Sequence, residues 1–155
     1  MTIYHRLLIP LDEDGCTRSR FDTIAALARD QAACVKLVTV VDVDAADYLG
    51  SELAAIAPEL IDETLVASAR ETLTEAAARL RDRGIRTETE LLISADGSID
   101  NPLLSAAKRW RADLIILASH GYQGLSLLLH ESITERLLEN LRLPILILPC
   151  KNETE

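Results

Sequence analysis

Two kinds of apolar segment alternate along the chain, and this alternation restricts the fold more than any other feature. Five short runs rich in Ile, Leu and Val contain three to five aliphatic residues each, with little polar alternation. Such runs are typical of strands that are buried on both faces, so we expect the strands to carry almost no charge. The runs cover residues 6–10, 35–41, 89–94, 113–118 and 144–149.

Segments with helical spacing separate these runs. One begins near Ser19. The longest begins near Pro58, a residue suited to a first helical turn, and ends at Gly84, which suits the position after a helix. A third begins at Asn101 and the last at Ser132. Helices therefore alternate with strands along most of the chain.

Alternating strands and helices predict a sheet of parallel strands that are joined by right-handed helical crossovers. The expected fold class is therefore α/β, as a single doubly wound domain with a five-stranded parallel sheet flanked by helices. We expect residues 1–150 to form this domain and residues 151–155 to form a short polar tail.

The chain is acidic, with 16 Lys and Arg against 25 Asp and Glu and a formal net charge of −9. Phosphate backbones and anionic membrane surfaces repel such a chain, so we expect no nucleic-acid partner. No uninterrupted apolar run exceeds five residues, which predicts no membrane insertion. The N-terminal apolar run is also too short for a signal peptide, so we expect a cytoplasmic protein.

Three cysteines, Cys16, Cys34 and Cys150, are scattered along the chain without a CxxC pair. An odd and dispersed set predicts reduced, intracellular thiols and no disulfide framework. Cys16 precedes a predicted helix, a place that activates thiols, but the acidic residues 12–14 oppose this effect and no second cysteine is near in sequence. A redox role for Cys16 is a third hypothesis beside the two functions given below.

Ligands of open parallel sheets bind beyond the carboxyl ends of the strands. The sequence there reads IPLD at residues 9–12, VVD at residues 40–42 and ADLIILASHG at residues 112–121, and the last predicted strand reads LPILILP at residues 143–149. These stretches resemble the universal stress protein family, and the resemblance covers essentially the whole chain. It implies an adenine nucleotide alpha hydrolase-like fold, in a family that contains both nucleotide binders and non-binders.

The resemblance also exposes a departure from the family's nucleotide motif. Nucleotide-binding members carry Gly-x-x-Gly, nine residues, then Gly-Ser or Gly-Thr, because glycine lets the backbone approach phosphate oxygens. The four corresponding residues here are Ala118, Gly121, Glu131 and Ser132, so two of the three glycines are missing although the spacing is kept. A carboxylate about 4 Å from a phosphate costs about 1 to 4 kcal/mol. We therefore expect ATP binding to be weakened or lost, with Mg²⁺ offsetting part of the repulsion and AMP tolerated better.

The resemblance implies roles for further residues. Asp12 would hydrogen-bond the adenosine, with Pro10, Leu11 and Val40 forming its apolar wall. The residues facing the ribose and phosphates would be His120, Gly121, Ser132, Ile133 and Thr134.

Several of these residues also have purely structural interpretations. Asp12 is suited to capping a turn through an Asx hydrogen bond. Ser132 is a competent N-cap with Glu135 as its capping-box partner, and Glu131 is then a favourable anion in the first turn of a helix. The His, Cys, Asp and Glu spacings match no metal site, and no nucleophile and base can be assembled, so we predict neither a metal nor catalysis.

The last predicted strand would be an edge of the sheet, and an apolar edge favours association. Universal stress proteins similarly pair their C-terminal strands, which implies a homodimer through Ile145, Leu146, Ile147 and Leu148. The main hypothesis is a non-enzymatic cytoplasmic stress-response protein that acts as a dimer through an unidentified protein partner. The alternative is a switch that binds an adenine nucleotide, ATP or AMP, with slow or no hydrolysis.

Overall fold

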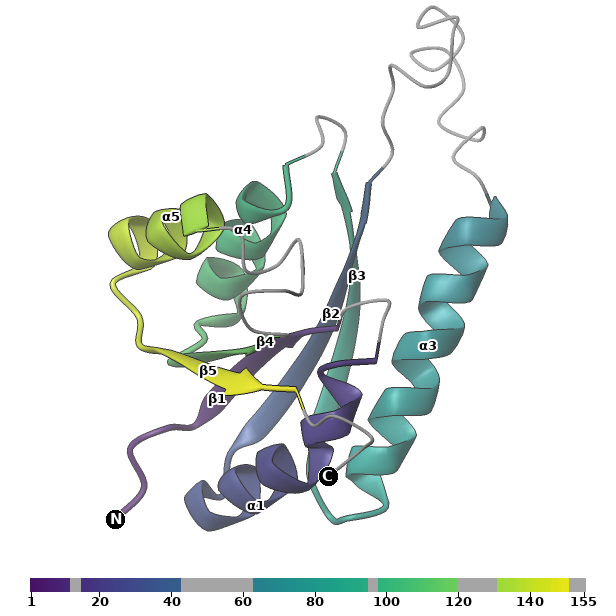
Figure 1. Ribbon diagram of the computed structural model, residues 1–155. Coiled ribbons are helices and arrows are strands. Elements are labelled where there is room, and N and C mark those ends of the chain that lie inside the picture. Colours follow the sequence, from purple (N-terminus) through teal and green to yellow (C-terminus); the bar gives the residue numbers. More distant parts are fainter. Residues whose placement is uncertain (12–14, 43–62, 95–97, 120–130, 151–155) are drawn as a thin grey trace, which may run out of the picture.

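The computed structural model describes residues 1–11, 15–42, 63–94, 98–119 and 131–150. Five parallel strands form one sheet in the order β3-β2-β1-β4-β5 (Figure 1). The five predicted strands are confirmed, although β2 and β3 begin one or two residues before the apolar runs. The strands are β1 (Arg6–Pro10), β2 (Cys34–Asp42), β3 (Thr87–Ser94), β4 (Leu114–Ser119) and β5 (Ile145–Pro149).

Helices cover both faces of the sheet, as a doubly wound fold requires (Figure 1). On one face lie α1 (Phe21–Gln31), which follows the 3-10 helix η1 (Arg18–Arg20), and α3 (Glu63–Arg81). On the other face lie α4 (Asp100–Trp110) and α5 (Glu131–Leu141). Among the helices of the described residues, none combines the length and the apolar character needed to cross a membrane.

The C-terminal end of α3 follows the sequence prediction. Gly84 has a φ of 81°, in the left-handed region that glycine adopts without strain. The N–H of Ile85 then donates to the carbonyl of Leu80 at 3.1 Å, which satisfies a carbonyl in the last turn of the helix. The predicted start of this helix near Pro58 lies outside the described residues.

Two apolar clusters, one on each face of the sheet, hold the layers together. Leu7 and Ile9 of β1 pack with Leu80 of α3 in the first cluster, between the sheet and helices α1 and α3. Leu8, between them in sequence, packs with Leu137 of α5 in the second cluster, between the sheet and helices α4 and α5. All five side chains are fully buried. Burial on both faces explains why β1 is an uninterrupted apolar run.

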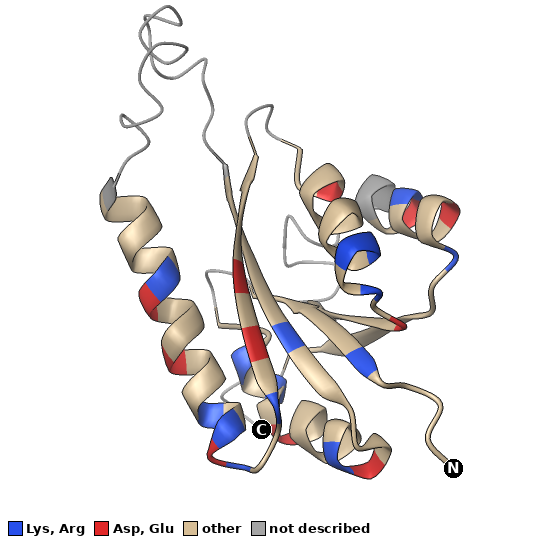
Figure 2. Ribbon diagram, turned by 180° about the vertical axis from the view of Figure 1, so that it is seen from behind, with Lys and Arg blue, Asp and Glu red and all other residues tan. Residues whose placement is uncertain are grey.

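Strand β3 departs from the expectation that the strands carry almost no charge. It forms one edge of the sheet, and its Glu88 and Glu90 lie beside Lys36 of β2, so that acidic and basic positions face each other across the two strands (Figure 2). Lys36 forms an ion pair with Glu90 at 2.9 Å. An edge strand is covered less completely than a central one, so its carboxylates find cationic partners and solvent.

The prediction of three reduced thiols is wrong. Cys16 and Cys150 form a disulfide with their Cα atoms 5.2 Å apart, although 134 positions of sequence separate them. Parallel strands end at the same edge of a sheet, so the segment after β1 and the residue after β5 meet there. Cys34, at the start of β2, is a free thiol. The disulfide removes the argument from cysteines for an intracellular location.

Candidate functional site

The carboxyl ends of β1 and β4 lie where the connections of the sheet diverge. The helix that follows β1, α1, covers one face of the sheet, whereas the helix that follows β4, α5, covers the other face (Figure 1). The two strands are neighbours, with Leu7 opposite Leu114 and Leu8 opposite Ile115. Open α/β sheets bind ligands at such a switch point, so this edge is the candidate site.

Pro10 and Val40 lie on the neighbouring strands β1 and β2 at this edge, and Leu11 directly follows β1. Pro10 ends β1 opposite Val38, and the N–H of Leu11 donates to the carbonyl of Val38 at 2.7 Å. Leu11 packs in the cluster beneath α1 and α3, whereas Val40 packs against the cluster beneath α4 and α5. The structure thus brings these three residues to one edge but directs Leu11 and Val40 into different layers.

Ala118 is the second-to-last residue of β4. Its side chain is 2% exposed, and its Cα partner in β5 is Leu148. An extended strand accommodates an alanine without backbone strain. The missing glycine at this position is therefore compatible with the fold.

The remaining candidate residues, apart from Asp12, follow in the chain after β4. Helix α5 begins at Glu131, so Ser132 lies within its first turn and not at the N-cap position that we predicted. Ile133 is in the same turn, and Thr134 is half-buried. Three candidates lie outside the described residues: Asp12, His120 and Gly121.

An ion pair that the sequence analysis missed fixes α5 against α4. Arg136 Nε lies 2.7 Å from Asp100 Oδ2, and Asp100 is 7% exposed at the first position of α4. Ser98 Oγ donates to the other carboxylate oxygen at 2.6 Å and accepts the N–H of Asn101 at 3.3 Å. Ser98 and Asp100 are typical residues for a helix start, but nothing in the sequence indicates the partner on α5. This contact holds the helix that carries Glu131 and Ser132.

Strand β5 confirms the predicted edge position, because it pairs with β4 on one side only within the described chain. Leu146 and Leu148 pack against the cluster beneath α1 and α3, and Ile145 packs against the opposite cluster. Ile147 is 47% exposed. The strand therefore presents one large apolar side chain beside its open hydrogen-bonding edge.

A second group of polar residues lies between α4 and the strands β2 and β3. Glu90 contacts Lys36 Nζ at 2.9 Å and Arg109 Nη1 at 2.8 Å. Burial alone would raise the pKa of Glu90, but the hydrogen bonds from Lys36 and Arg109 outweigh it and lower the pKa below its ordinary value. The Nζ of Lys36 also lies 5.7 Å from the centre of the Trp110 ring. This group stabilises the packing of α4 on the sheet.

Cys34 belongs to the same layer. Its Sγ lies 3.8 Å from Glu88 Oε2, which also accepts the indole N–H of Trp110 at 2.9 Å. Burial raises the pKa of the Cys34 thiol, and the carboxylate of Glu88 raises it further. Cys34 is therefore a weakly ionised thiol.

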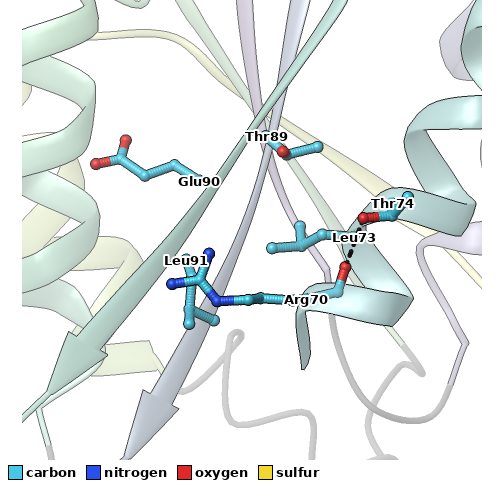
Figure 3. Close-up of a pocket in the computed structure, with 6 residues that line it drawn as sticks. All are labelled: Arg70, Leu73, Thr74, Thr89, Glu90 and Leu91. Carbon is cyan, nitrogen blue, oxygen red and sulfur yellow. Dashed lines mark hydrogen bonds between the residues drawn. The ribbon is translucent and has the colours of Figure 1, made fainter. Parts of the chain in front are cut away.

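A cavity of about 410 Å³ lies between α3 and the edge strand β3, away from the candidate site (Figure 3). Thr89 and Leu91 of β3 line it together with Arg70, Leu73 and Thr74 of α3. The hydroxyl of Thr74 donates a hydrogen bond at 2.9 Å to the backbone carbonyl of Arg70, one turn earlier in α3. Strand β2 separates this cavity from β1, so the cavity is not part of the switch point.

Comparison with known proteins agrees with this architecture. The sequence model described as the universal stress protein family matches residues 3–149. This chain belongs to the universal stress protein family. A relative in Methanocaldococcus jannaschii, the universal stress protein MJ0531, is 28% identical over 94% of this chain and 82% of its own length.

Solved structures of universal stress proteins share the fold. The crystal structure of a family member from Burkholderia pseudomallei is 28% identical and has a TM-score of 0.69, covering 95% of this chain and 97% of its own. The universal stress protein from Archaeoglobus fulgidus in complex with dAMP is 19% identical and has a TM-score of 0.60, covering 97% of this chain and 100% of its own. At 19% identity the second likeness shows the fold alone.

Proposed function

We propose that this universal stress protein is a non-enzymatic stress-response protein that acts in the cytoplasm as a homodimer, through a protein partner. The dimer is supported by the edge of β5 that pairs with no other strand of the described chain, where Ile147 is 47% exposed. An apolar strand edge is prone to pair with another strand, and a second copy of β5 offers a matching one. Pro144 and Pro149 donate no backbone N–H, so they limit the pairing to Ile145–Leu148.

Light scattering coupled to size-exclusion chromatography tests the dimer at tens of micromolar protein. We expect Ile147→Asp to convert the dimer to monomer, because each new carboxylate would be buried in an apolar seam and the two copies would repel each other. Leu138→Asp is the matched control, since Leu138 is also 47% exposed but lies on α5. A monomeric wild type, or a dimer that survives Ile147→Asp, would refute pairing through β5.

The same proposal holds that ATP binding is weakened or lost. Backbone N–H groups at the start of α5 would attract a phosphate, but Glu131 is the first residue of that helix. A carboxylate in the first turn of a helix is favourable for the helix dipole, and a carboxylate near a triphosphate is repelled by its charges. Glu131 therefore supports the structural interpretation of this turn over a triphosphate site.

Substitution of Glu131 tests the weakened site directly. Glu131→Gly restores a family glycine, and removing about 1.4 kcal/mol of repulsion would strengthen ATP binding about tenfold in calorimetry. Glu131→Gln separates the charge from the bulk of the side chain, and Glu139→Gln on the exposed face of α5 is the control. Equal ATP affinity in the wild type and in Glu131→Gly would contradict the proposal.

A second candidate function is a switch that binds an adenine nucleotide, ATP or AMP, with slow or no hydrolysis. Two observations favour it: the apolar residues Pro10, Leu11 and Val40 reach the switch-point edge, and a solved family member is a complex with dAMP. One phosphate would approach Glu131 less closely than three.

Nucleotide released by denaturing freshly purified protein, separated by anion exchange, distinguishes the two functions. Near-stoichiometric AMP would favour the switch, and near-stoichiometric ATP would in addition refute the weakened triphosphate site. An empty protein that AMP does not stabilise thermally would refute the switch.

A further inference from the structure

The disulfide between Cys16 and Cys150 joins two segments that come from opposite ends of the sequence. Cys16 lies in the turn that follows β1, and Cys150 directly follows β5. In the sheet, β4 stands between these two strands, so the bridge spans the carboxyl edge across one intervening strand. The covalent link therefore fixes the end of the edge strand β5 to the segment that leads into α1.

One contact that involves no sulfur holds the same two segments together, and a second fixes the turn to β1. The guanidinium Nε of Arg20, in η1, donates to the carbonyl of Pro149, the last residue of β5. Thr17 Oγ1 donates to the carbonyl of Pro10 at 3.2 Å and ties the turn to the end of β1. The bond from Arg20 to Pro149 would keep the two thiols close together after the disulfide opens. Two thiols held in this way re-form a bridge at a high effective concentration.

The two sulfur positions differ in access. Cys16 is 2% exposed, whereas Cys150 is half-buried. Exchange requires an attacking thiolate to reach one sulfur, so a reagent in solution reaches Cys150 first. Cys34 is at the opposite end of the sheet, at the first residue of β2, where burial and then the carboxylate of Glu88 raise the pKa of its thiol. Cys34 is therefore poorly suited to form a disulfide with Cys16 or Cys150 in place of their own bridge.

We propose that Cys16 and Cys150 form a reversible thiol–disulfide exchange site, with Cys150 as the entry sulfur and Cys16 as the resolving sulfur. Its reaction partners are low-molecular-weight thiols and disulfides. The site does not depend on nucleotide binding or on a dimer, so it goes beyond the function proposed above. It also reconciles a disulfide with a cytoplasmic protein, because cytoplasmic disulfides are usually transient.

Each direction of the exchange is balanced. In oxidation, the Cys150 thiolate attacks one sulfur of the small disulfide, whose S–S bond breaks and releases one small thiolate. The Cys16 thiolate then attacks the Cys150 sulfur of the mixed disulfide and releases the second small thiolate. The protein has lost two electrons to the small disulfide, and its two thiol protons end on the two small thiols. Reduction reverses both steps, beginning with attack of a small thiolate on the Cys150 sulfur.

Mass spectrometry of the folded full chain, equilibrated in mixtures of reduced and oxidised glutathione and quenched with acid, tests the site. We expect the wild type to pass between the dithiol and the internal disulfide, with little glutathione retained. In Cys16→Ser the entry sulfur has no resolving partner, so the adduct should accumulate at Cys150. In Cys150→Ser the buried Cys16 should carry only a trace of adduct, and Cys34→Ser should behave as the wild type.

Three results would overturn the proposal. The first is a wild-type bridge that reduced glutathione does not open while the protein stays folded. The second is a lasting glutathione adduct on the wild type in place of the internal disulfide. The third is more adduct on Cys150→Ser than on Cys16→Ser. The first two results come from the unsubstituted protein, so they decide the matter even where a serine variant folds poorly.

Discussion

Glu90 shows how a charged side chain is accommodated in the layer between a sheet and a helix. Its two carboxylate oxygens have separate cationic partners, Lys36 on β2 and Arg109 on α4. The lysine side chain is 13% exposed and the arginine side chain 56% exposed, so the contact with Lys36 is the one that water screens less. Most of the electrostatic stabilisation therefore comes from the strand pair.

The lowered pKa of Glu90 predicts a pH-dependent loss of stability on substitution. A carboxyl group with a depressed pKa in the folded state stabilises the protein above its ordinary pKa, and it loses that contribution as the pH falls through the folded-state value. We expect Glu90→Gln to lower the free energy of unfolding by about 1 to 3 kcal/mol at neutral pH. The deficit should shrink in acid, as urea denaturation at several pH values would measure.

Glu75→Gln is the matched control, because Glu75 is exposed on α3. It should cost little at any pH. A deficit in Glu90→Gln that stays constant from neutral to acidic pH would show that packing, and not charge, accounts for the loss.

Helix α3 contains a buried and an exposed leucine, whose replacement should change the free energy of unfolding by different amounts. Leu80 is fully buried in the cluster beneath α1 and α3, whereas Leu65, four turns earlier, is 41% exposed. We expect Leu80→Ala to reduce the free energy of unfolding by about 2 to 5 kcal/mol, through lost burial and a cavity. Leu65→Ala should cost less than about 1 kcal/mol. Chemical denaturation of both variants measures the difference, and equal losses would contradict the packing of α3.

The strands and helices could be predicted from sequence wherever burial is uniform. The run at residues 6–10 matches β1 because both of its faces are covered. Strand β3 begins two residues before its apolar run, where Thr87 is buried and Glu88 accepts the indole N–H of Trp110 on α4, and such tertiary partners leave no periodic signal in the sequence. Helix α5 likewise includes Glu131, one residue before the predicted start.

The candidate site could be predicted as an edge but not as a set of side-chain directions. Parallel strands that end together bring Pro10, Leu11 and Val40 to one edge, whatever covers them. The layer into which each side chain turns depends on where the helices pack. The contact between Arg136 and Asp100 and the pairing of Cys16 with Cys150 depend on the same placement, so spacing along the chain gave no indication of them.

The disulfide also affects the stability of the whole molecule, because it closes a loop of most of the chain. Opening such a loop restores conformational freedom to the unfolded state, and it should lower the free energy of unfolding by about 2 to 5 kcal/mol. The corresponding fall in the melting temperature is about 10 °C for a chain of this size. Calorimetry with and without a strong reductant measures the effect.

Two cysteine variants make the measurement specific. Cys16→Ser should melt near the reduced wild type and should not respond to reductant. Cys34→Ser should respond as the wild type does. A reductant effect that persists in Cys16→Ser would contradict a stabilising role for this bridge.

The central place of β1 has a consequence for how the protein is made. One side of β1 pairs with β2, the next strand to be synthesised, but its other side waits for β4. The Arg6 N–H reaches its acceptor on Asp113 across 107 positions of sequence. On the ribosome, the emerging chain therefore carries an unpaired apolar strand edge until the fourth strand is translated. Folding of this domain should be completed late in translation. Nascent chains stalled before β4 should bind chaperones and should be digested readily by proteases.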